Sequence, residues 1–416
     1  MPLQHFHYAE GRLYCEQVPV HRIAEAAGTP TYVYSSRAIR DNYRSYRNAF
    51  ASVPHEIHYA VKANSSLSIL ALLASEGAGF DIVSGGELFR VLRAGGDPEK
   101  VVFSGVGKTR AEVEYALEHG IGAFHCESAD ELDVIRDAAR RTGASPAVGL
   151  RVNPNIDAQT HPYIATGLSE HKFGVAMGEA ESLYRDAPRW EPLRFTCLSC
   201  HIGSQIFDTA VFGDALAQML SLAARLRDLG RSVRTIDIGG GLGVGYEEGQ
   251  PSVSIAAYGR LLTDELRGRG FRLGLEPGRS IVGQAGSMLT RVLYCKSGGR
   301  KTFVVVDGAM NDLIRPALYS AHHEVLPERL RGGERTECDV VGPVCESGDF
   351  LASGRELQPC LAGDVLAIAT AGAYGFVQSS NYNSRPRAAE VLVDGDGFRV
   401  VRTRETVEDL IRGETL

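Results

Sequence analysis

Short apolar runs alternate with amphipathic stretches between residues 57 and 278. The strand-like runs lie at residues 57–63, 80–85, 101–105, 123–128, 147–153, 195–204, 235–241 and 272–278. Helix-like stretches separate them, for example residues 66–77, 85–96, 110–120 and 128–143, and several end at a glycine. This alternation is typical of a parallel sheet covered by helices. Eight strand–helix units in about 220 residues match a (β/α)8 barrel better than an open doubly wound sheet, so we predict an α/β fold with a TIM-like barrel.

The pattern changes after about residue 280. The runs KTFVVVDGAM, ECDVVGPVC, DVLAIATAGAYG and AAEVLVDGDGFRVV are strand-like, carry Gly and Asp-Gly turns, and lack regular helices between them. They predict a separate all-β domain. Near the amino terminus, HFHYAEGRLYCE resembles a hairpin about Gly11, and chain ends often lie close together. We therefore expect residues 1–30 to join the β domain, residues 31–280 to form the barrel, and residues 281–416 to form the C-terminal β domain.

The composition indicates an ordinary globular protein, because 44% of the 416 residues are hydrophobic and 23% are charged. The net charge of −7 and the absence of a long Lys/Arg run disfavour nucleic acid or an anionic membrane as the main partner, which leaves small molecules. Eight cysteines form no disulfide framework and are typical of a reducing compartment. The first residues have no basic and apolar signal pattern, and no apolar run approaches the length of a membrane span. We expect a cytoplasmic protein.

The first strand-like run ends on Lys62 in the stretch EIHYAVKANSS. A lysine at the end of a strand ordinarily extends its ammonium into water. The alternative is an amine placed there to attack a carbonyl group, which requires burial or charged neighbours that keep it partly unprotonated. The carboxyl ends of barrel strands are where such barrels hold their active sites, so Lys62 has the right position for this second role.

Three other strand ends carry residues that suit an anion or a cofactor. The seventh run leads into Gly239, Gly240 and Gly241, and the eighth leads into the sequence EPGR, with Glu276 and Gly278. The loops after these two strands commonly bind phosphate, and consecutive glycines let backbone N–H groups approach it closely. The sixth run ends in CHIGSQ, with His201 and Ser204. Taken alone, each feature has a structural explanation. The glycines could form a tight turn, Glu276 could belong to a structural ion pair, and His201 could be a core histidine.

Together the motifs identify a family. The chain resembles the alanine-racemase-fold decarboxylases that depend on pyridoxal phosphate, and among them diaminopimelate decarboxylase. The match rests on the following segments, in order along the chain: YAVKAN, FDIVSGGEL, FSGVGKT, THPYIATGL, HKFG, HIGSQ, GGGLGV, EPGRS, MNDLIRPALY, GPVCESGDF and GAYGFVQSSNYN. The polar insertion at residues 153–174 contains two of these segments, and we expect it to fold over the barrel mouth.

The resemblance implies a role for each matching residue. Lys62 would carry the cofactor covalently, Glu276 would pair with its ring nitrogen, and His201 would lie against its ring. The phosphate would be held by Gly239, Gly240, Gly241, Ser204, Gly278 and Tyr374. The family also implies a homodimer with shared active sites, in which Cys345 and Glu346 reach the partner's site. Cys345 would return a proton to the substrate, and Glu346 would meet its distal amine.

Substrate choice has its own argument in the sequence. Arg315 and Tyr319 are four residues apart, so one helical turn points both side chains the same way. With Arg279 they predict a clamp for a second, non-reacting carboxylate. Tyr374 is expected to contact substrate as well. Together with the clamp, the resemblance implies decarboxylation of meso-2,6-diaminopimelate to L-lysine, the last step of lysine biosynthesis.

Alternatives remain open at this point. One is a sister decarboxylase that acts on another acidic amino acid or on a carboxylated polyamine, which a panel of substrates tested for CO2 release would separate. A catalytically silent regulatory homologue would be expected to lack Lys62 or Cys345, and both are present. An alanine racemase is disfavoured by the GPVCESGDF segment.

Other candidate residues have structural interpretations. We predict no metal site, since Cys197 and Cys200 lie in a buried run and no second pair has ligand spacing. His322 and His323 are expected at the surface. The family suggests a salt bridge between Lys172 and Asp349 across a dimer.

Overall fold

The computed structural model describes residues 3–156, 172–299 and 301–416. The chain divides into two compact units, and each is described by itself. The barrel unit comprises residues 42–244 and 252–280, and the β unit comprises residues 1–41, 245–251 and 281–416. Most of the insertion that we expected over the barrel mouth, residues 157–171, lies outside the described residues.

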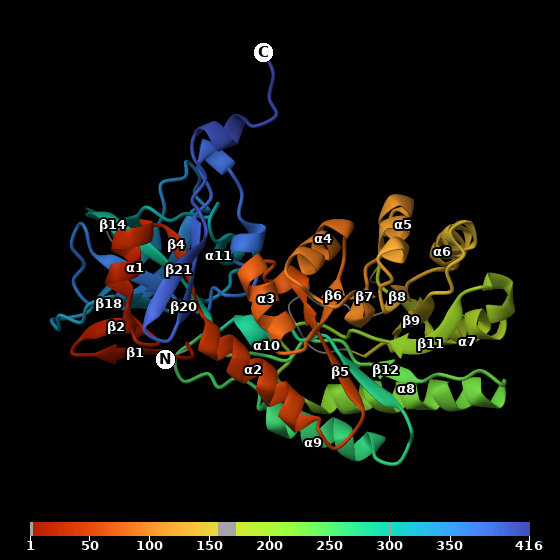
Figure 1. Cartoon of the computed structure of the whole chain (residues 1–416). Coiled ribbons are helices and arrows are strands. Elements are labelled where there is room, and N and C mark those ends of the chain that lie inside the picture. The colour runs from red at the N-terminus through yellow and green to blue at the C-terminus, as the bar shows by residue number, and fades with distance from the viewer. Residues whose placement is uncertain (1–2, 157–171, 300) are drawn as a thin grey trace. The chain divides into compact units, whose positions relative to one another are not determined.

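The barrel unit contains the predicted closed parallel sheet (Figure 1). Its strands are β5 (His55–Ala60), β6 (Gly79–Ile82), β7 (Val101–Phe103), β8 (Ala123–Cys126), β9 (Ala147–Asn153), β11 (Arg194–Ser199), β12 (Thr235–Asp237) and β13 (Arg272–Leu275). Each pairs in parallel with the next, β13 pairs with β5, and the short β10 (Val175–Ala176) adds to β9. The eight predicted strand-like runs thus correspond to the eight barrel strands. Parallel strands covered on both faces carry nearly continuous apolar residues, which is why the pattern was readable.

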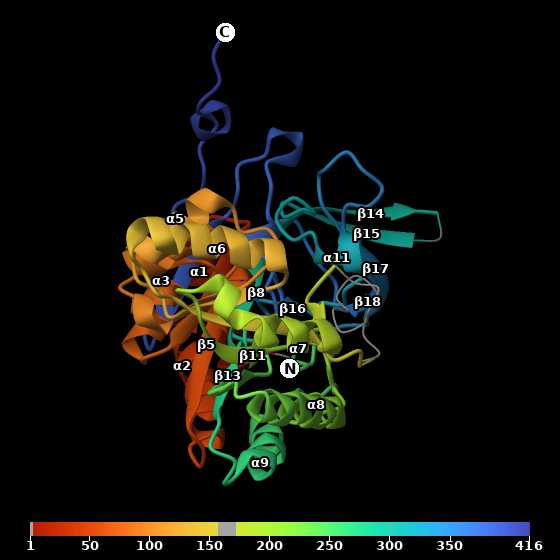
Figure 2. The ribbon, with the colours of Figure 1, turned by 90° about the vertical axis from the view of Figure 1, so that its right-hand side faces the viewer.

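Helices cover the outside of this sheet. They are α3 (Leu67–Ser75), α4 (Gly85–Arg93), α5 (Arg110–Glu118), α6 (Ala129–Thr142), α7 (Met177–Arg185), α8 (Ala210–Asp228) and α9 (Ile255–Leu266). Figure 2 shows α5 beside α6 and α8 beside α9. Their ends follow local rules: Thr109 and Glu112 form a capping box at the start of α5, and Gly143 ends α6 in the left-handed conformation. Helices α1 (Val20–Ala27) and α2 (Ser36–Ala49) precede β5 in the chain, and α10 (Arg279–Val282) follows β13.

The β unit is built on the long strand β14 (Gly286–Gly298). Its sheet also contains β4 (Thr31–Ser35), β15 (Lys301–Val306), β16 (Val325–Pro327), β17 (Thr336–Val341), β18 (Phe350–Leu357), β19 (Val365–Ile368), β20 (Ala389–Asp394) and β21 (Gly397–Arg402). Strand β4 pairs with β14 and β20, although the expected boundary at residue 31 placed it in the barrel. The short helix α11 (Arg315–Tyr319) lies between β15 and β16 in sequence.

The amino-terminal residues join the β unit. Strands β1 (Phe6–Ala9), β2 (Arg12–Cys15) and β3 (Val18–Pro19) form a small sheet, with the predicted turn at Gly11 between the first two. Leu13 and Ile23 share one buried cluster with Leu289, Val365 and Val391. Burying this apolar surface fixes the amino-terminal segment on the C-terminal sheet.

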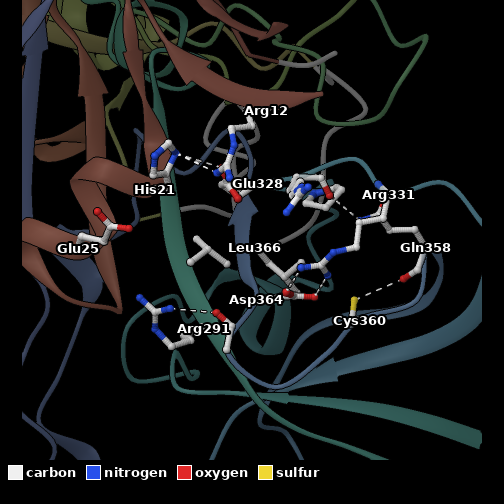
Figure 3. Close-up of a pocket in the computed structure, with 14 residues that line it drawn as sticks. Arg12, His21, Glu25, Arg291, Glu328, Arg331, Gln358, Cys360, Asp364 and Leu366 are labelled. Carbon is white, nitrogen blue, oxygen red and sulfur yellow. Dashed lines mark hydrogen bonds and ion pairs between the residues drawn. The ribbon is translucent and has the colours of Figure 1, made fainter. Parts of the chain in front are cut away.

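A cavity of about 370 Å³ lies in the β unit, lined by ion pairs (Figure 3). Arg12 donates to Glu328 at 2.7 Å, and Arg331 forms two contacts with Asp364. Arg291 donates to the carbonyl of Gly363 at 2.9 Å. None of the predicted site residues lines this cavity.

Within the described residues, every helix is too short or too polar to traverse a lipid bilayer.

Candidate active site

Lys62 lies just past the end of its strand. Strand β5 stops at Ala60, and Lys62 is in the 3-10 turn Val61–Ala63. The prediction that the strand itself ends on Lys62 is therefore wrong by two residues. Its Nζ donates to Oδ2 of Asp81, on β6, at 2.5 Å. Burial, reinforced by the charge of Glu276, raises the pKa of Asp81, while Lys62 opposes the shift. The second oxygen of Asp81 is buried and makes no hydrogen bond to a described residue. Lys62 is therefore positioned by a buried carboxylate rather than simply extended into water.

Glu276 follows the last barrel strand and is 9% exposed. Its Oε1 lies 3.4 Å from Nδ1 of His125, on β8, and accepts from the hydroxyl of Ser104 at 3.5 Å. The Sγ of Cys197 lies 3.7 Å from the other ring nitrogen of His125. Burial alone would raise the pKa of Glu276, but the hydrogen bond with His125 and the neighbouring positive charges outweigh it and lower the pKa. The carboxyl group is thereby kept ionised inside the barrel.

His201 follows β11 and is oriented by the glycine-rich turn. The N–H of Gly240 donates to its Nδ1 at 3.2 Å, so this nitrogen carries no proton. Burial, together with the charges of Arg151 and Lys62, lowers the pKa of His201 to about 3. The ring is therefore neutral near pH 7. Because Lys62 acts electrostatically on both His201 and Glu276, the three predicted residues share one environment at the strand ends.

The glycines after β12 allow close backbone contact. A Cβ on Gly240 would lie 2.2 Å from the carbonyl oxygen of Glu276, and one on Gly241 would lie 2.2 Å from that of Gly203. Gly239 has φ +70° and donates its N–H to Asp237 at 2.7 Å. Larger residues would force the turn apart, so these positions require glycine. Two of the three amides that we expected to face phosphate thus bond Asp237 and His201.

Ser204 and Arg279 lie together in the barrel unit. Nη2 of Arg279 donates to Oγ of Ser204 at 3.1 Å, and Arg279 is 8% exposed. The neighbouring Gly278 packs on Ala60 and Ala63, and a Cβ there would lie 2.9 Å from that of Ala63. The residues expected to hold phosphate and one expected to hold a carboxylate are thus adjacent.

His125, Asp237 and Glu276 offer ligand atoms within 4.8 Å of one another, all of them buried. Such a group has the composition of a metal site. Each residue already has a protein partner, however: Glu276 for His125, and the N–H of Gly239 for Asp237. A cation would have to replace these contacts, and we assign the cluster to holding Glu276 in place.

The β unit contains the remaining predicted residues. Arg315 and Tyr319 share α11, as the spacing indicated. Arg315 is buried, with 6% of its surface exposed, whereas an ordinary helix arginine is solvated. Its Nη1 lies 2.8 Å from Nε2 of His323. The prediction that His323 lies at the surface is wrong, because this residue is 0% exposed; His322 is partly exposed. The pair HH in a polar segment gave no sign that one ring is buried.

Cys345 and Glu346 lie on an exposed loop after β17. The N–H of Cys345 donates to Asn383 at 3.0 Å, and its thiol is free. Glu346 accepts from the hydroxyl of Tyr382 at 2.8 Å. Tyr374 has a positive φ of 55°, an uncommon backbone conformation for a tyrosine that functional loops often contain.

Comparison with known proteins identifies the family. Residues 36–283 match the family model described as pyridoxal-dependent decarboxylase, pyridoxal binding domain. The chain is 53% identical to the diaminopimelate decarboxylase of Pseudomonas aeruginosa over 411 residues, which are 99% of each protein. The enzyme of the same name from Neisseria meningitidis is 48% identical over 97% of this chain and 98% of its own length.

Solved structures agree. The M. jannaschii diaminopimelate decarboxylase in complex with L-lysine has a TM-score of 0.95 at 34% identity, with 100% of this chain and 99% of that chain covered. The Helicobacter pylori enzyme complexed with L-lysine has a TM-score of 0.91 at 42% identity, with 94% and 98% covered. This chain belongs to the diaminopimelate decarboxylase family. As a member it is a pyridoxal phosphate-dependent carboxy-lyase.

The barrel residues suit the cofactor of this family. Pyridoxal phosphate requires an amine for its aldehyde, a carboxylate for its ring nitrogen, and small residues near its phosphate. Lys62, Glu276 and the Gly239–Gly241 turn offer these three features in one unit, and the unpaired oxygen of Asp81 next to Lys62 leaves an acceptor for a proton.

Sequence reasoning gave no role to Asp81, Glu87 or His125. Asp81 and Glu87 both lie in FDIVSGGEL, which the resemblance included without a function. Burial raises the pKa of Glu87 to about 7, although its carboxylate accepts from the N–H of Val83 at 2.7 Å. The sequence did contain one signal for these two carboxylates, because Asp81 lies near a strand end and Glu87 lies in the first turn of the next helix. His125 points inward from β8, and only barrel closure brings it to Glu276.

Two structural expectations can also be assessed. Cys197 and Cys200 are buried free thiols, as small core residues should be. Asp349 is buried and accepts from the N–H groups of Met310 and Val344, both at 2.7 Å. Its bridge to Lys172 across a dimer stays a prediction.

Proposed function

We propose that this chain decarboxylates meso-2,6-diaminopimelate to L-lysine and CO2 as a homodimer in the cytoplasm. The observation that carries the proposal is the grouping of Lys62, His201 and Glu276 at the carboxyl ends of the barrel strands. That grouping would supply an amine, an uncharged ring and an ionised carboxylate to one cofactor. The eight cysteines are free thiols, which is typical of a reducing compartment.

Pyridoxal phosphate, when bound, supplies an aldehyde that captures amines and a ring that accepts the electron pair released with CO2. Lys62 would hold the aldehyde, and its Nζ would have to lose a proton to do so. Asp81 is placed to take up that proton and to return it, because its Oδ2 receives the Nζ hydrogen bond and burial raises its pKa.

Glu276 sets the charge of the cofactor ring. An ionised carboxylate favours a protonated ring nitrogen, and His125 and Ser104 keep Glu276 ionised and oriented. His201 would lie against the ring as a neutral imidazole, so it would add a flat surface without a competing charge. The phosphate is assigned to the Gly239–Gly241 turn with Ser204, Gly278 and Tyr374.

The substrate contacts come from the β unit and Arg279. Arg315, Tyr319 and Arg279 hold the carboxylate that does not react, and Tyr374 adds to this site. Cys345 donates a proton to the substrate α-carbon after CO2 departs, and Glu346 receives the distal amine. Cys345, Glu346 and the 46%-exposed Tyr382 form an exposed group, which supports covering by a second copy of the chain.

The buried clamp arginine favours a dicarboxylic substrate. Lysine and ornithine have no second carboxylate for the buried Arg315 to bind, whereas a dicarboxylic substrate has one. A carboxylated polyamine remains the strongest competing substrate class, because it also presents several amines and a carboxylate.

The test is direct. Purified protein with pyridoxal phosphate is incubated with meso-diaminopimelate, L-lysine, L-ornithine or a carboxylated polyamine, and both CO2 and the amine product are measured. We expect CO2 and L-lysine in equal amounts from meso-diaminopimelate, and at least about a hundredfold lower kcat/KM with the others. Preference for the polyamine would move the chain to a sister reaction. No CO2 from any compound would contradict the proposed function.

A further inference from the structure

Arg315 and His323 form a buried pair in the β unit. Arg315 is 6% exposed, and His323 is 0% exposed. Nη1 of Arg315 lies 2.8 Å from Nε2 of His323. The other ring nitrogen, Nδ1, lies 2.7 Å from the carbonyl oxygen of Ala369. Both distances are those of good hydrogen bonds, so the imidazole has a defined partner at each nitrogen.

The two partners determine the protonation state of His323. A carbonyl oxygen only accepts, so Nδ1 carries the proton and donates to Ala369. A guanidinium only donates, so Nε2 must present its lone pair to Arg315. The ring is therefore neutral and in a single tautomer.

Tyr246 restricts the guanidinium from another direction. The guanidinium carbon of Arg315 lies 4.6 Å from the centroid of the Tyr246 ring, within the range of a cation–π contact. Tyr246 also contacts His323 edge to face, with centroids 5.2 Å apart and an interplanar angle of 90°. The three side chains thus orient one another.

The neutrality of both neighbours matters for binding. A carboxylate beside Arg315 would fix its position but would also neutralise its charge and compete with an anionic ligand. An imidazole lone pair and an aromatic ring orient the guanidinium without placing a negative charge beside it. This arrangement differs from Arg331 in the same unit, whose guanidinium is bound by the carboxylate of Asp364.

We propose that His323 is the positioning residue that orients Arg315 toward the non-reacting carboxylate of the substrate. The inference rests on the proposed function and makes His323 a determinant of specificity, not a catalytic residue. It predicts that His323 affects the binding of ligands with that carboxylate and has little effect on ligands without it.

Two substitutions separate the two hydrogen bonds of His323. His323→Gln keeps an acceptor near the position of Nε2, and His323→Asn keeps a donor near the position of Nδ1 but does not reach Arg315. Both variants retain a polar side chain. His322→Gln is the matched control, because its ring contacts Arg355 and Glu324 at 2.8 and 3.1 Å and does not bond Arg315.

The experiment uses the dimeric holoenzyme with cofactor bound. Calorimetry measures Kd for L-lysine, which has the carboxylate, and for cadaverine, which lacks it; kcat and KM are measured with meso-diaminopimelate. In His323→Asn we expect Kd for L-lysine and KM to rise about tenfold, with Kd for cadaverine and kcat within about twofold of the unsubstituted enzyme. His323→Gln should restore most of the affinity, and His322→Gln should behave like the unsubstituted enzyme.

The inference is overturned if His323→Asn binds L-lysine normally, or if it weakens cadaverine as much as L-lysine, which would indicate a general structural role. It is also overturned if His323→Gln is as impaired as His323→Asn. The unsubstituted enzyme tests the proposed function separately: if it yields no L-lysine from meso-diaminopimelate, that proposal fails whatever the His323 variants show.

Discussion

The barrel unit and the β unit treat their functional charges in opposite ways. In the barrel, Lys62 faces the carboxylate of Asp81, and Glu276 faces His125. Burial raises the pKa of Asp81, whereas His125 and nearby positive charges lower the pKa of Glu276. In the β unit, Arg315 is buried against a neutral imidazole and an aromatic ring. Proton transfer requires groups with tuned pKa values, whereas recognition of an anion is favoured by a cation that neutral neighbours hold in a fixed orientation.

The β unit also leaves two other predicted site residues, Cys345 and Glu346, exposed. Cys345 is held through its backbone amide, and the carboxylate of Glu346 accepts from the hydroxyl of Tyr382, while both residues stay exposed. The barrel thus brings together the residues that we propose for the cofactor, and the β unit exposes the groups that we propose for a second copy of the chain. The following predictions test this difference.

Replacing the amine in the barrel should have the largest effect. Lys62→Ala removes the covalent attachment and should lower kcat/KM for meso-diaminopimelate on the order of 10⁴-fold or more. The visible absorbance of the attached cofactor should disappear as well. Lys100→Ala, at an exposed lysine of the same unit, is the control. A Lys62→Ala enzyme that stays coloured and active would show that Lys62 does not hold the cofactor in the barrel unit.

Cys345→Ala should have the next largest effect. Loss of a general acid ordinarily slows a reaction about 10²- to 10⁴-fold, and proton return to the substrate should become slower or misdirected. Cofactor absorbance should be unchanged, because the thiol lies outside the barrel unit. Rate and product partition are measured beside Cys360→Ala, a partly buried thiol of the same unit. Normal values for both in Cys345→Ala would assign the acid elsewhere.

Arg315→Ala should mainly weaken substrate binding. Loss of a charge-assisted hydrogen bond costs about 2 to 3 kcal/mol, or about 30- to 150-fold in kcat/KM. KM should carry most of the change, and the cofactor spectrum should be unaffected. Arg331→Ala is the control, since that guanidinium is bound to Asp364. An unchanged KM in Arg315→Ala would show that the carboxylate binds elsewhere.

The last prediction concerns the pH dependence of stability in the barrel, and its full size is reached only at acid pH. Burial lowers the pKa of His58 to about 4, although Glu56 and Glu276 oppose the shift. Between about pH 6.5 and 4, His58 binds a proton more readily in the unfolded chain than in the folded one. The contribution of His58 to the free energy of unfolding is therefore fully present above this window and is lost as the pH falls through it. The maximum contribution is about 3 kcal/mol.

His58→Gln should remove this part of the pH dependence. Urea unfolding of the two proteins between pH 4 and 7 measures it, and the free-energy difference between them should change with pH. Parallel stability curves would show that His58 contributes no proton linkage.

The sequence predicted the barrel because its buried strands carry continuous apolar runs that end in polar or glycine-rich turns. It did not place β4, whose partners β14 and β20 lie more than 250 residues further along the chain. Lys62, His201 and Glu276 could be inferred from their positions at strand ends. Asp81 and His125 could not, because their contacts depend on which strands become neighbours. His323 was misplaced for the same reason, since Ala369 lies 46 residues away.

The central claim is that Lys62 binds pyridoxal phosphate covalently at the end of β5. The most direct measurement is borohydride reduction of the holoenzyme followed by peptide mass spectrometry. We predict a pyridoxyl-phosphate adduct on the peptide that contains Lys62, and none on Lys100 or Lys108. An unmodified Lys62, or an adduct on another lysine, would contradict the account.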